Sequence, residues 1–68
     1  MRDPNRLYGF YNELTRVHIE HFPDWRFGQL MNNFLGWVQV KKEKDFFYIE
    51  ENKMLDLLHE YVQYIKGE

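Results

Sequence analysis

The chain has 68 residues with a formal net charge of −2, and 44% of them are hydrophobic and 19% aromatic, which suits residues 1–68 forming a single folded domain with one modest core. The near-neutral charge gives no electrostatic reason to expect DNA or RNA as the main partner, and the lack of cysteine excludes disulfides and thiolate metal sites. The sequence predicts neither a signal peptide nor a membrane span, so we expect a cytoplasmic protein.

The first predicted helix begins with Asp3 as N-cap and Pro4 at the first helical position. It should end near His21, because Pro23 disfavours helical geometry in the residue before it. Gly9 weakens such a helix, and its presence predicts close packing against that position. Apolar side chains and one histidine recur at steps of three and four along one face: Leu7, Phe10, Tyr11, Leu14, Val17 and His18.

A second predicted helix begins at Asp24, whose carboxylate suits the free N–H groups and the positive dipole end of a first turn. Its apolar stripe has helical spacing and should face the core: Phe27, Leu30, Met31, Phe34, Leu35 and Val38. The other faces carry Arg26, Gln29, Asn32 and Asn33. Asparagine is a poor helix former, so two in mid-helix are either tolerated or used.

Residues 40–45 form a charged connection without helical periodicity. The aromatic run from Asp45 to Ile49 is too short for a helix, and we expect an extended segment that adds its rings to the core. The last helix should run from Glu51 to Lys66 and end at Gly67, with the apolar stripe Met54, Leu55, Leu58, Tyr61, Val62 and Ile65. The prediction is an all-α, small three-helix bundle with a short extended aromatic segment before the last helix.

Histidines and carboxylates are the side chains here that bear on catalysis or metal binding. His18 and His21 could supply two ligands from one helix face, but a zinc site needs at least three protein ligands and only His59 remains. The carboxylates of the last helix suit a solvated acidic face: Glu50, Glu51, Asp56 and Glu60. We therefore expect no metal, no cofactor and no enzymatic activity.

Both tryptophans flank the predicted central helix, and large aromatic side chains often anchor protein interfaces. Together with the polar residues of that helix they form the predicted binding set: Trp25, Arg26, Gln29, Asn33 and Trp37. The leading hypothesis is a non-enzymatic protein-binding domain with a regulatory or adaptor role. Its partner would be another protein, and a homodimer is a further option.

The alternative is a nucleic-acid accessory protein. Lys41, Lys42 and Lys44 lie near aromatic side chains, an arrangement that single-stranded nucleic acid uses for stacking and charge. Glu43 and Asp45 interrupt that positive charge, however, and a binding stripe normally carries more. This alternative would also use Arg2, Arg6 and Arg26.

Three motifs span almost the whole chain: Arg2-Asp3-Pro4-Asn5-Arg6, then Pro23-Asp24-Trp25-Arg26-Phe27-Gly28-Gln29-Leu30, then Phe47-Tyr48-Ile49-Glu50-Glu51. They resemble the RDPxR, PDxRxGQL and FYxE[DE] motifs of a family of small uncharacterised bacterial and phage proteins. The resemblance implies a bacterial or phage origin and a stand-alone domain, and it carries no activity. The charged connection between Trp37 and Asp45 is longer than the family pattern.

If the motif residues act jointly, the resemblance implies a hydrogen-bonded ion cluster that ties the three segments together. Its members would be Arg2, Arg6 and Arg26 on one side and Glu50 and Glu51 on the other. Such a cluster is structural first.

Overall fold

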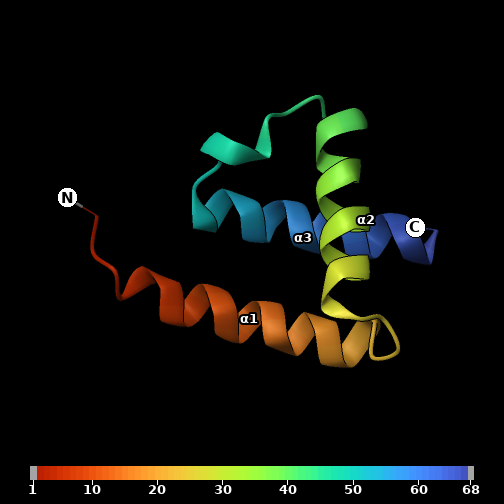
Figure 1. The fold of residues 1–68 in the computed structure, drawn as a ribbon, viewed down its shortest axis with the longest axis horizontal. Coiled ribbons are helices and arrows are strands. Elements are labelled where there is room, and N and C mark those ends of the chain that lie inside the picture. Colours follow the sequence, from red (N-terminus) through yellow and green to blue (C-terminus); the bar gives the residue numbers. More distant parts are fainter. Residues whose placement is uncertain (1, 68) are drawn as a thin grey trace.

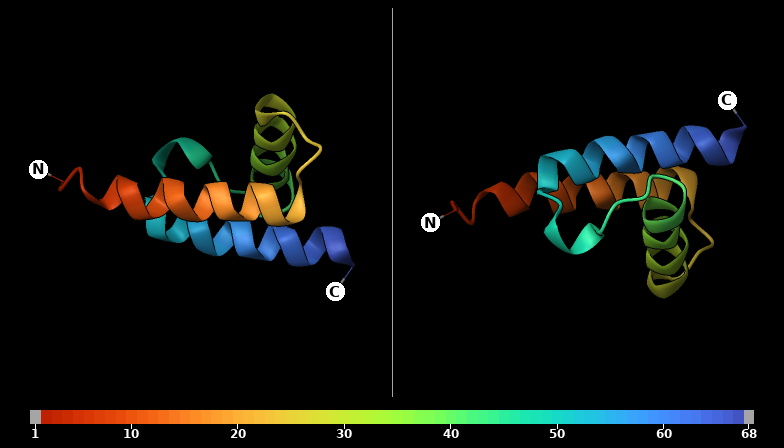
Figure 2. Two further views of the ribbon diagram at one scale, coloured as in Figure 1. Left: turned by 90° about the horizontal axis from the view of Figure 1, so that it is seen from below. Right: turned by 90° about the horizontal axis from the view of Figure 1, so that it is seen from above.

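The computed structural model describes residues 2–67, and its helices form two layers (Figure 1). The elements are α1 (Arg6–His21), α2 (Phe27–Val40), the 3₁₀ turn η1 (Phe46–Tyr48) and α3 (Glu51–Lys66). Helices α1 and α3 run side by side in the same direction, and α2 and η1 lie together on one face of this pair (Figure 2). The predicted all-α fold with three helices is confirmed.

The predicted start of the first helix was wrong, because α1 begins at Arg6 with Asn5 as its N-cap and no capping side chain, and Asp3 lies in the turn ahead of it. Asp3 Oδ1 accepts a hydrogen bond from the N–H of Asn5 at 2.9 Å, and the N–H of Arg6 donates to the Asp3 carbonyl oxygen at 3.2 Å. This opening turn precedes α1, which ends at His21, where the prediction placed its end. The prediction for Gly9 was wrong, because no atom lies within 4 Å of the place where a Cβ would stand.

Helix α2 begins three residues later than predicted, at Phe27 instead of Asp24. The N–H of Trp25 donates to the Phe22 carbonyl oxygen, which places Asp24 inside a turn. The hydrogen bond at this helix start involves a residue inside the helix: Gln29 Oε1 accepts from the N–H of Arg26 at 2.8 Å. Gln29, in the first turn of α2, thus satisfies the backbone N–H of the N-cap residue Arg26, and Asp24 lies outside the helix.

The aromatic segment before α3 has extended backbone at Asp45 and Ile49, with η1 between them. Asp45 Oδ1 accepts from the N–H of Phe47 at 3.0 Å and closes the turn. Phe46 packs against the core, as does Ile49. Phe47 and Tyr48 are 78% and 77% exposed, so the expectation that this segment gives all its rings to the core was wrong. A 3₁₀ turn points successive side chains in three directions, and only one of them is inward.

Helix α3 has the predicted bounds, Glu51–Lys66. Gly67 follows in the left-handed conformation with φ of 80°, and its N–H donates to the carbonyl oxygens of Gln63 and Tyr64. Glycine adopts this conformation without the strain that a Cβ would cause.

The core lies where α2 crosses the α1–α3 pair, and its buried residues are Val17, Phe22, Leu30, Phe34, Val38, Leu57, Leu58, Tyr61 and Val62. At four helical positions it differs from the predicted apolar stripes. Phe27 is 66% exposed and Tyr11 is 57% exposed, because α2 crosses the pair and covers only part of each apolar stripe (Figure 1). Leu57, outside the predicted stripe, is buried. Ile65, at the far end of that stripe, is 45% exposed.

Candidate functional site

A groove of about 480 Å³ lies between α2 and the second half of α3. Three of the five predicted binding residues line it, namely Trp25, Asn33 and Trp37. The remaining lining residues are Val40, Lys41, Tyr61, Tyr64 and Ile65. We call this the aromatic groove; both tryptophans of the chain belong to it.

The wall of the aromatic groove is a set of mutually packed rings. The Trp37 ring centroid lies 5.3 Å from that of Tyr61 and 5.7 Å from that of Tyr64. Tyr61 is buried and Tyr64 is exposed. Burial raises the pKa of the Tyr61 phenol, which therefore stays neutral at physiological pH. These contacts hold Trp37 in place before any partner arrives, which reduces the entropy lost on binding.

The other two predicted binding residues, Arg26 and Gln29, continue the same side of α2 beyond the groove. The steps from Arg26 through Gln29 and Asn33 to Trp37 are three, four and four residues, the spacing of one helical stripe. Gln29 uses its side-chain oxygen to accept from the N–H of Arg26, and Arg26 itself is exposed and directly precedes α2.

Positive charge adjoins the rings at the other end of α2. Lys41 is exposed and lines the aromatic groove. Lys42 Nζ lies 5.9 Å from the Trp37 ring centroid and 2.9 Å from Glu60 Oε1, so its charge is shared between the ring face and a carboxylate. The groove thus combines aromatic walls with the ammonium group of Lys41.

A second, smaller groove of about 220 Å³ lies on the other side of α2 and reaches α1 and η1. All its lining residues are apolar or aromatic, and we call it the apolar groove: Phe10, Tyr11, Leu14, Phe27, Met31, Phe34, Leu35, Phe46, Met54 and Leu58. Phe34 and Leu58 are buried, whereas Tyr11 and Phe27 are mostly exposed. Sequence reasoning assigned these residues to the core and missed the groove, because periodicity does not show where a covering element stops.

Two ion pairs join the residues at the beginning of α1 to those at the beginning of α3. Arg2 Nη2 lies 2.6 Å from Glu50 Oε2, and Arg6 Nε lies 2.8 Å from Glu51 Oε1. The hydrogen bond from Arg6 lowers the pKa of Glu51. These are four of the five residues in the cluster that the family resemblance implies. The fifth, Arg26, directly precedes α2, and the beginning of α2 lies beside the end of α1, away from the beginnings of α1 and α3 (Figure 1).

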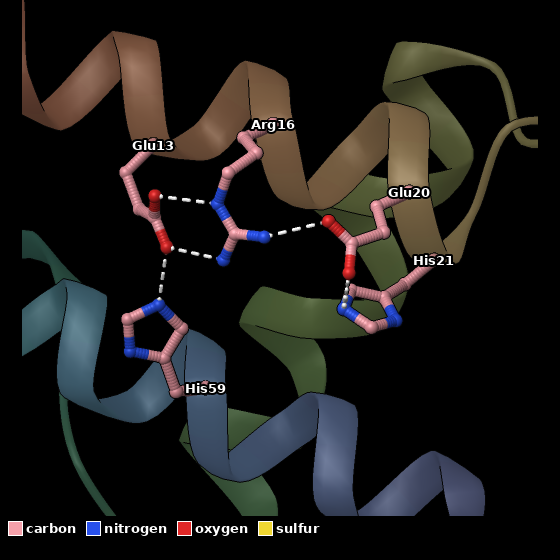
Figure 3. Close-up of polar contacts among 5 residues, drawn as sticks. All are labelled: Glu13, Arg16, Glu20, His21 and His59. Carbon is pink, nitrogen blue, oxygen red and sulfur yellow. Dashed lines mark hydrogen bonds and ion pairs between the residues drawn. The ribbon is translucent and has the colours of Figure 1, made fainter.

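A second polar network connects the middle of α1 to α3 (Figure 3). Glu13 accepts hydrogen bonds from Arg16 Nε at 2.9 Å and Nη2 at 2.7 Å, and from His59 Nε2 at 2.7 Å. Arg16 Nη1 also donates to Glu20 at 2.7 Å, and His21 Nε2 lies 3.6 Å from Glu20. The bonds from Arg16 and His59 lower the pKa of Glu13 to about 2. We call these five residues the Glu13 network.

The Glu13 network was missed from sequence because it depends on how α1 and α3 align. Glu13 and Arg16 have a helical spacing that predicts a local pair. Their partner His59 lies 46 residues from Glu13, close to the 45-residue separation of Arg6 and Glu51. A constant offset of this kind follows from two helices running in the same direction, as Figure 2 shows.

His18, the remaining histidine, forms a hydrogen bond with a backbone carbonyl group. Its Nε2 lies 2.7 Å from the Trp25 carbonyl oxygen, within the turn between α1 and α2. Within residues 2–67, no three His, Cys, Asp or Glu side chains are grouped so that they could hold a metal ion. Across the same residues, no helix is long and apolar enough to cross a membrane.

Comparison with known proteins adds no relative. No protein-family model matches the chain, and neither a curated protein nor a solved structure resembles it significantly. Function is therefore inferred from the arrangement of the residues described above.

Proposed function

We propose that the chain is a non-enzymatic module that binds a segment of another protein in the aromatic groove. The observation that carries this proposal is the convergence of both tryptophans with Tyr61 and Tyr64 on one groove. Tryptophan and tyrosine dominate the energetics of protein interfaces, since they bury much area and lose little conformational entropy. Asn33 adds an amide on the same side of α2.

The chemistry of the groove favours a partner segment that carries a carboxylate beside an apolar or aromatic side chain. The apolar side chain would pack against the wall that Trp37 and Tyr64 form, and the carboxylate would meet the ammonium group of Lys41. Arg26, further along the same side of α2, is a second cation for a longer segment. We further propose that the chain belongs to the bacterial and phage family whose motifs it resembles, and that it acts in the cytoplasm.

The nucleic-acid alternative is less favoured, because the cations that it needs lie in separate places and three of them are paired with carboxylates. Arg2 and Arg6 pair with carboxylates at the beginning of α1 and α3. Lys42 pairs with Glu60 near the connection that follows α2. Phosphate contacts require cations along one continuous track.

A randomised peptide library tests the proposal even while the natural partner is unidentified. The wild-type chain should select peptides in which Asp or Glu stands next to a large apolar residue. Binding should change tryptophan fluorescence, since both tryptophans line the groove. The variant Tyr64→Ala should bind the selected peptides roughly 5-fold or more weakly, and Lys41→Glu should abolish the preference for acidic residues.

Each variant has a matched control far from the groove. Tyr8→Ala removes an exposed tyrosine from α1, and Lys53→Glu reverses an exposed lysine near the beginning of α3. Both should bind like the wild type. The proposal is overturned if the wild type selects no peptides beyond those that Tyr64→Ala also selects, or if it binds only oligonucleotides at low salt.

A further inference from the structure

We infer that the apolar groove is the interface through which two copies of this chain associate. The inference is independent of the proposed function, which uses the other side of α2. It commits to one occupant, a second copy related by a two-fold axis. In such an interface the same face is buried on both copies.

The surface area of the chain supports this occupant. The folded chain exposes 5205 Å², whereas a compact monomer of 8.5 kDa exposes about 4,650 Å². This excess of roughly 550 Å² belongs to the chain as a whole, and the exposed rings of Phe27 and Tyr11 contribute to it; an interface of standard size covers ~800 Å² on each partner. A chain of this length is also marginally stable alone, since its core is small.

The composition of the apolar groove favours a second copy of the same face as its occupant, rather than a charged partner. Its lining residues are apolar or aromatic, so a partner gains by presenting apolar surface and loses by burying charge. The face itself meets that requirement, because Phe27 and Tyr11 rim the groove and are 66% and 57% exposed. A net charge of −2 gives little repulsion between copies.

The groove also has room for a ring from the second copy. Its volume is about 220 Å³, and an apolar cavity of about 150 Å³ holds benzene. Met31 and Met54 line the groove, and methionine adapts its shape to an incoming aromatic side chain. We therefore place Phe27 of each copy over the groove of the other.

The test is sedimentation equilibrium of the full chain from micromolar to millimolar concentration. The wild type should pass from monomer to dimer in this range. Phe27→Asp should raise the dimer dissociation constant at least roughly 30-fold, the effect of removing a central interface residue. The matched control is Ile19→Asp, which places the same charge at a 67% exposed apolar position of α1 outside both grooves and should dimerise like the wild type.

A second measurement needs no variant and locates the interface. On dilution, the methyl NMR signals of Met31 and Met54 should shift, while the indole signals of Trp25 and Trp37 in the aromatic groove should stay in place. The inference is overturned if the wild type is monomeric at millimolar concentration, if Phe27→Asp and Ile19→Asp dimerise equally, or if the indole signals shift and the methionine signals do not. The first two results leave peptide binding in the aromatic groove untouched, whereas shifting indole signals would place self-association in that groove, where it would compete with a peptide.

Discussion

The two grooves beside α2 differ in how they are built. The aromatic groove is lined from α2, α3 and the residues next to α2, and its rings contact one another within the chain. The apolar groove needs α1, α2, α3 and η1 together, and its rim residues Phe27 and Tyr11 are mostly exposed. One helix thus presents a preformed wall on one side and an incompletely covered core on the other. The first suits recognition of a foreign side chain, and the second suits association.

The two grooves are separated by a pair of contacting rings, Phe34 and Tyr61, which we call the partition. Phe34 is buried and lines the apolar groove, and its ring centroid lies 5.5 Å from that of Tyr61, which lines the aromatic groove. A change at Phe34 can therefore reach the aromatic groove through its contact with Tyr61. Substitutions in the partition, in each groove and outside both grooves should separate the role of the aromatic groove from that of the apolar groove.

Phe34→Ala should have the largest effect, because it removes the partition. A buried phenylalanine replaced by alanine costs roughly 3–5 kcal/mol through lost burial and the cavity left behind, which is a large share of the stability of so small a domain. Urea unfolding followed by circular dichroism measures the loss. Val40→Ala, at an exposed position of α2, should change stability by less than about 0.5 kcal/mol. Equal losses in the two variants would show that Phe34 is not the shared support.

Trp37→Ala and Phe27→Ala compare the two sides directly. Trp37 is half-buried against Tyr61 and Tyr64, so its truncation should lower the free energy of unfolding by about 1–3 kcal/mol. Phe27 is exposed in the single chain, and its truncation should cost less than about 0.5 kcal/mol at dilutions where the chain is monomeric. A reversed order would contradict the comparison, and repeating the titration at millimolar concentration should reveal a cost for Phe27→Ala only there.

Gly36→Ala should stabilise the chain by roughly 0.5–1 kcal/mol, because it removes the conformational freedom of a glycine inside a helix. Gly36 lies within α2 and lines neither groove, and no atom lies within 4 Å of the place of its new Cβ. Thermal unfolding should show the gain, while peptide binding and dimerisation stay unchanged. A loss of stability would indicate that the new Cβ at position 36 clashes with a neighbouring side chain.

Acid should weaken the connection between α1 and α3, because the Glu13 network joins these two helices, which both help to line the apolar groove. The pKa of Glu13 is lowered from 4.5 to about 2, so its stabilising contribution is complete above pH 4.5 and is lost as the pH falls toward 2. The difference in urea midpoint between the wild type and Glu13→Gln should therefore shrink over that range. The effect should be the smallest of the four, because the pair is exposed and screened by water. A difference that grew with acid would contradict the assignment.

Much of the local structure was predictable, and the reasons are local. The bounds of α3 follow from a continuous apolar period, an acidic beginning and Gly67, all of which act within one turn of the helix. The turn that Asp3 closes ahead of α1 is equally local. The motif residues Arg2, Arg6, Glu50 and Glu51 do meet in pairs, but their joint role came from a resemblance, and Arg26 lies elsewhere.

Three of the five residues predicted for binding line one groove, and the shape of that groove could not be predicted. Trp25, Asn33 and Trp37 line one groove with Tyr61 and Tyr64, and the contribution of α3 could not be read from α2 alone. The apolar groove was missed because its residues have the pattern of a core stripe. Whether such a stripe is buried depends on the element that covers it.

Local rules act between residues a few positions apart, so the order of residues was enough to specify three helices, their approximate ends and their apolar faces. The course of α2 across the α1–α3 pair, the exposure of Phe27, the burial of Leu57 and the contact between Glu13 and His59 depend on segments far apart in the chain. Those features came from packing, because hydrophobic burial has no direction of its own, and the mutual fit of whole helices selects which faces meet.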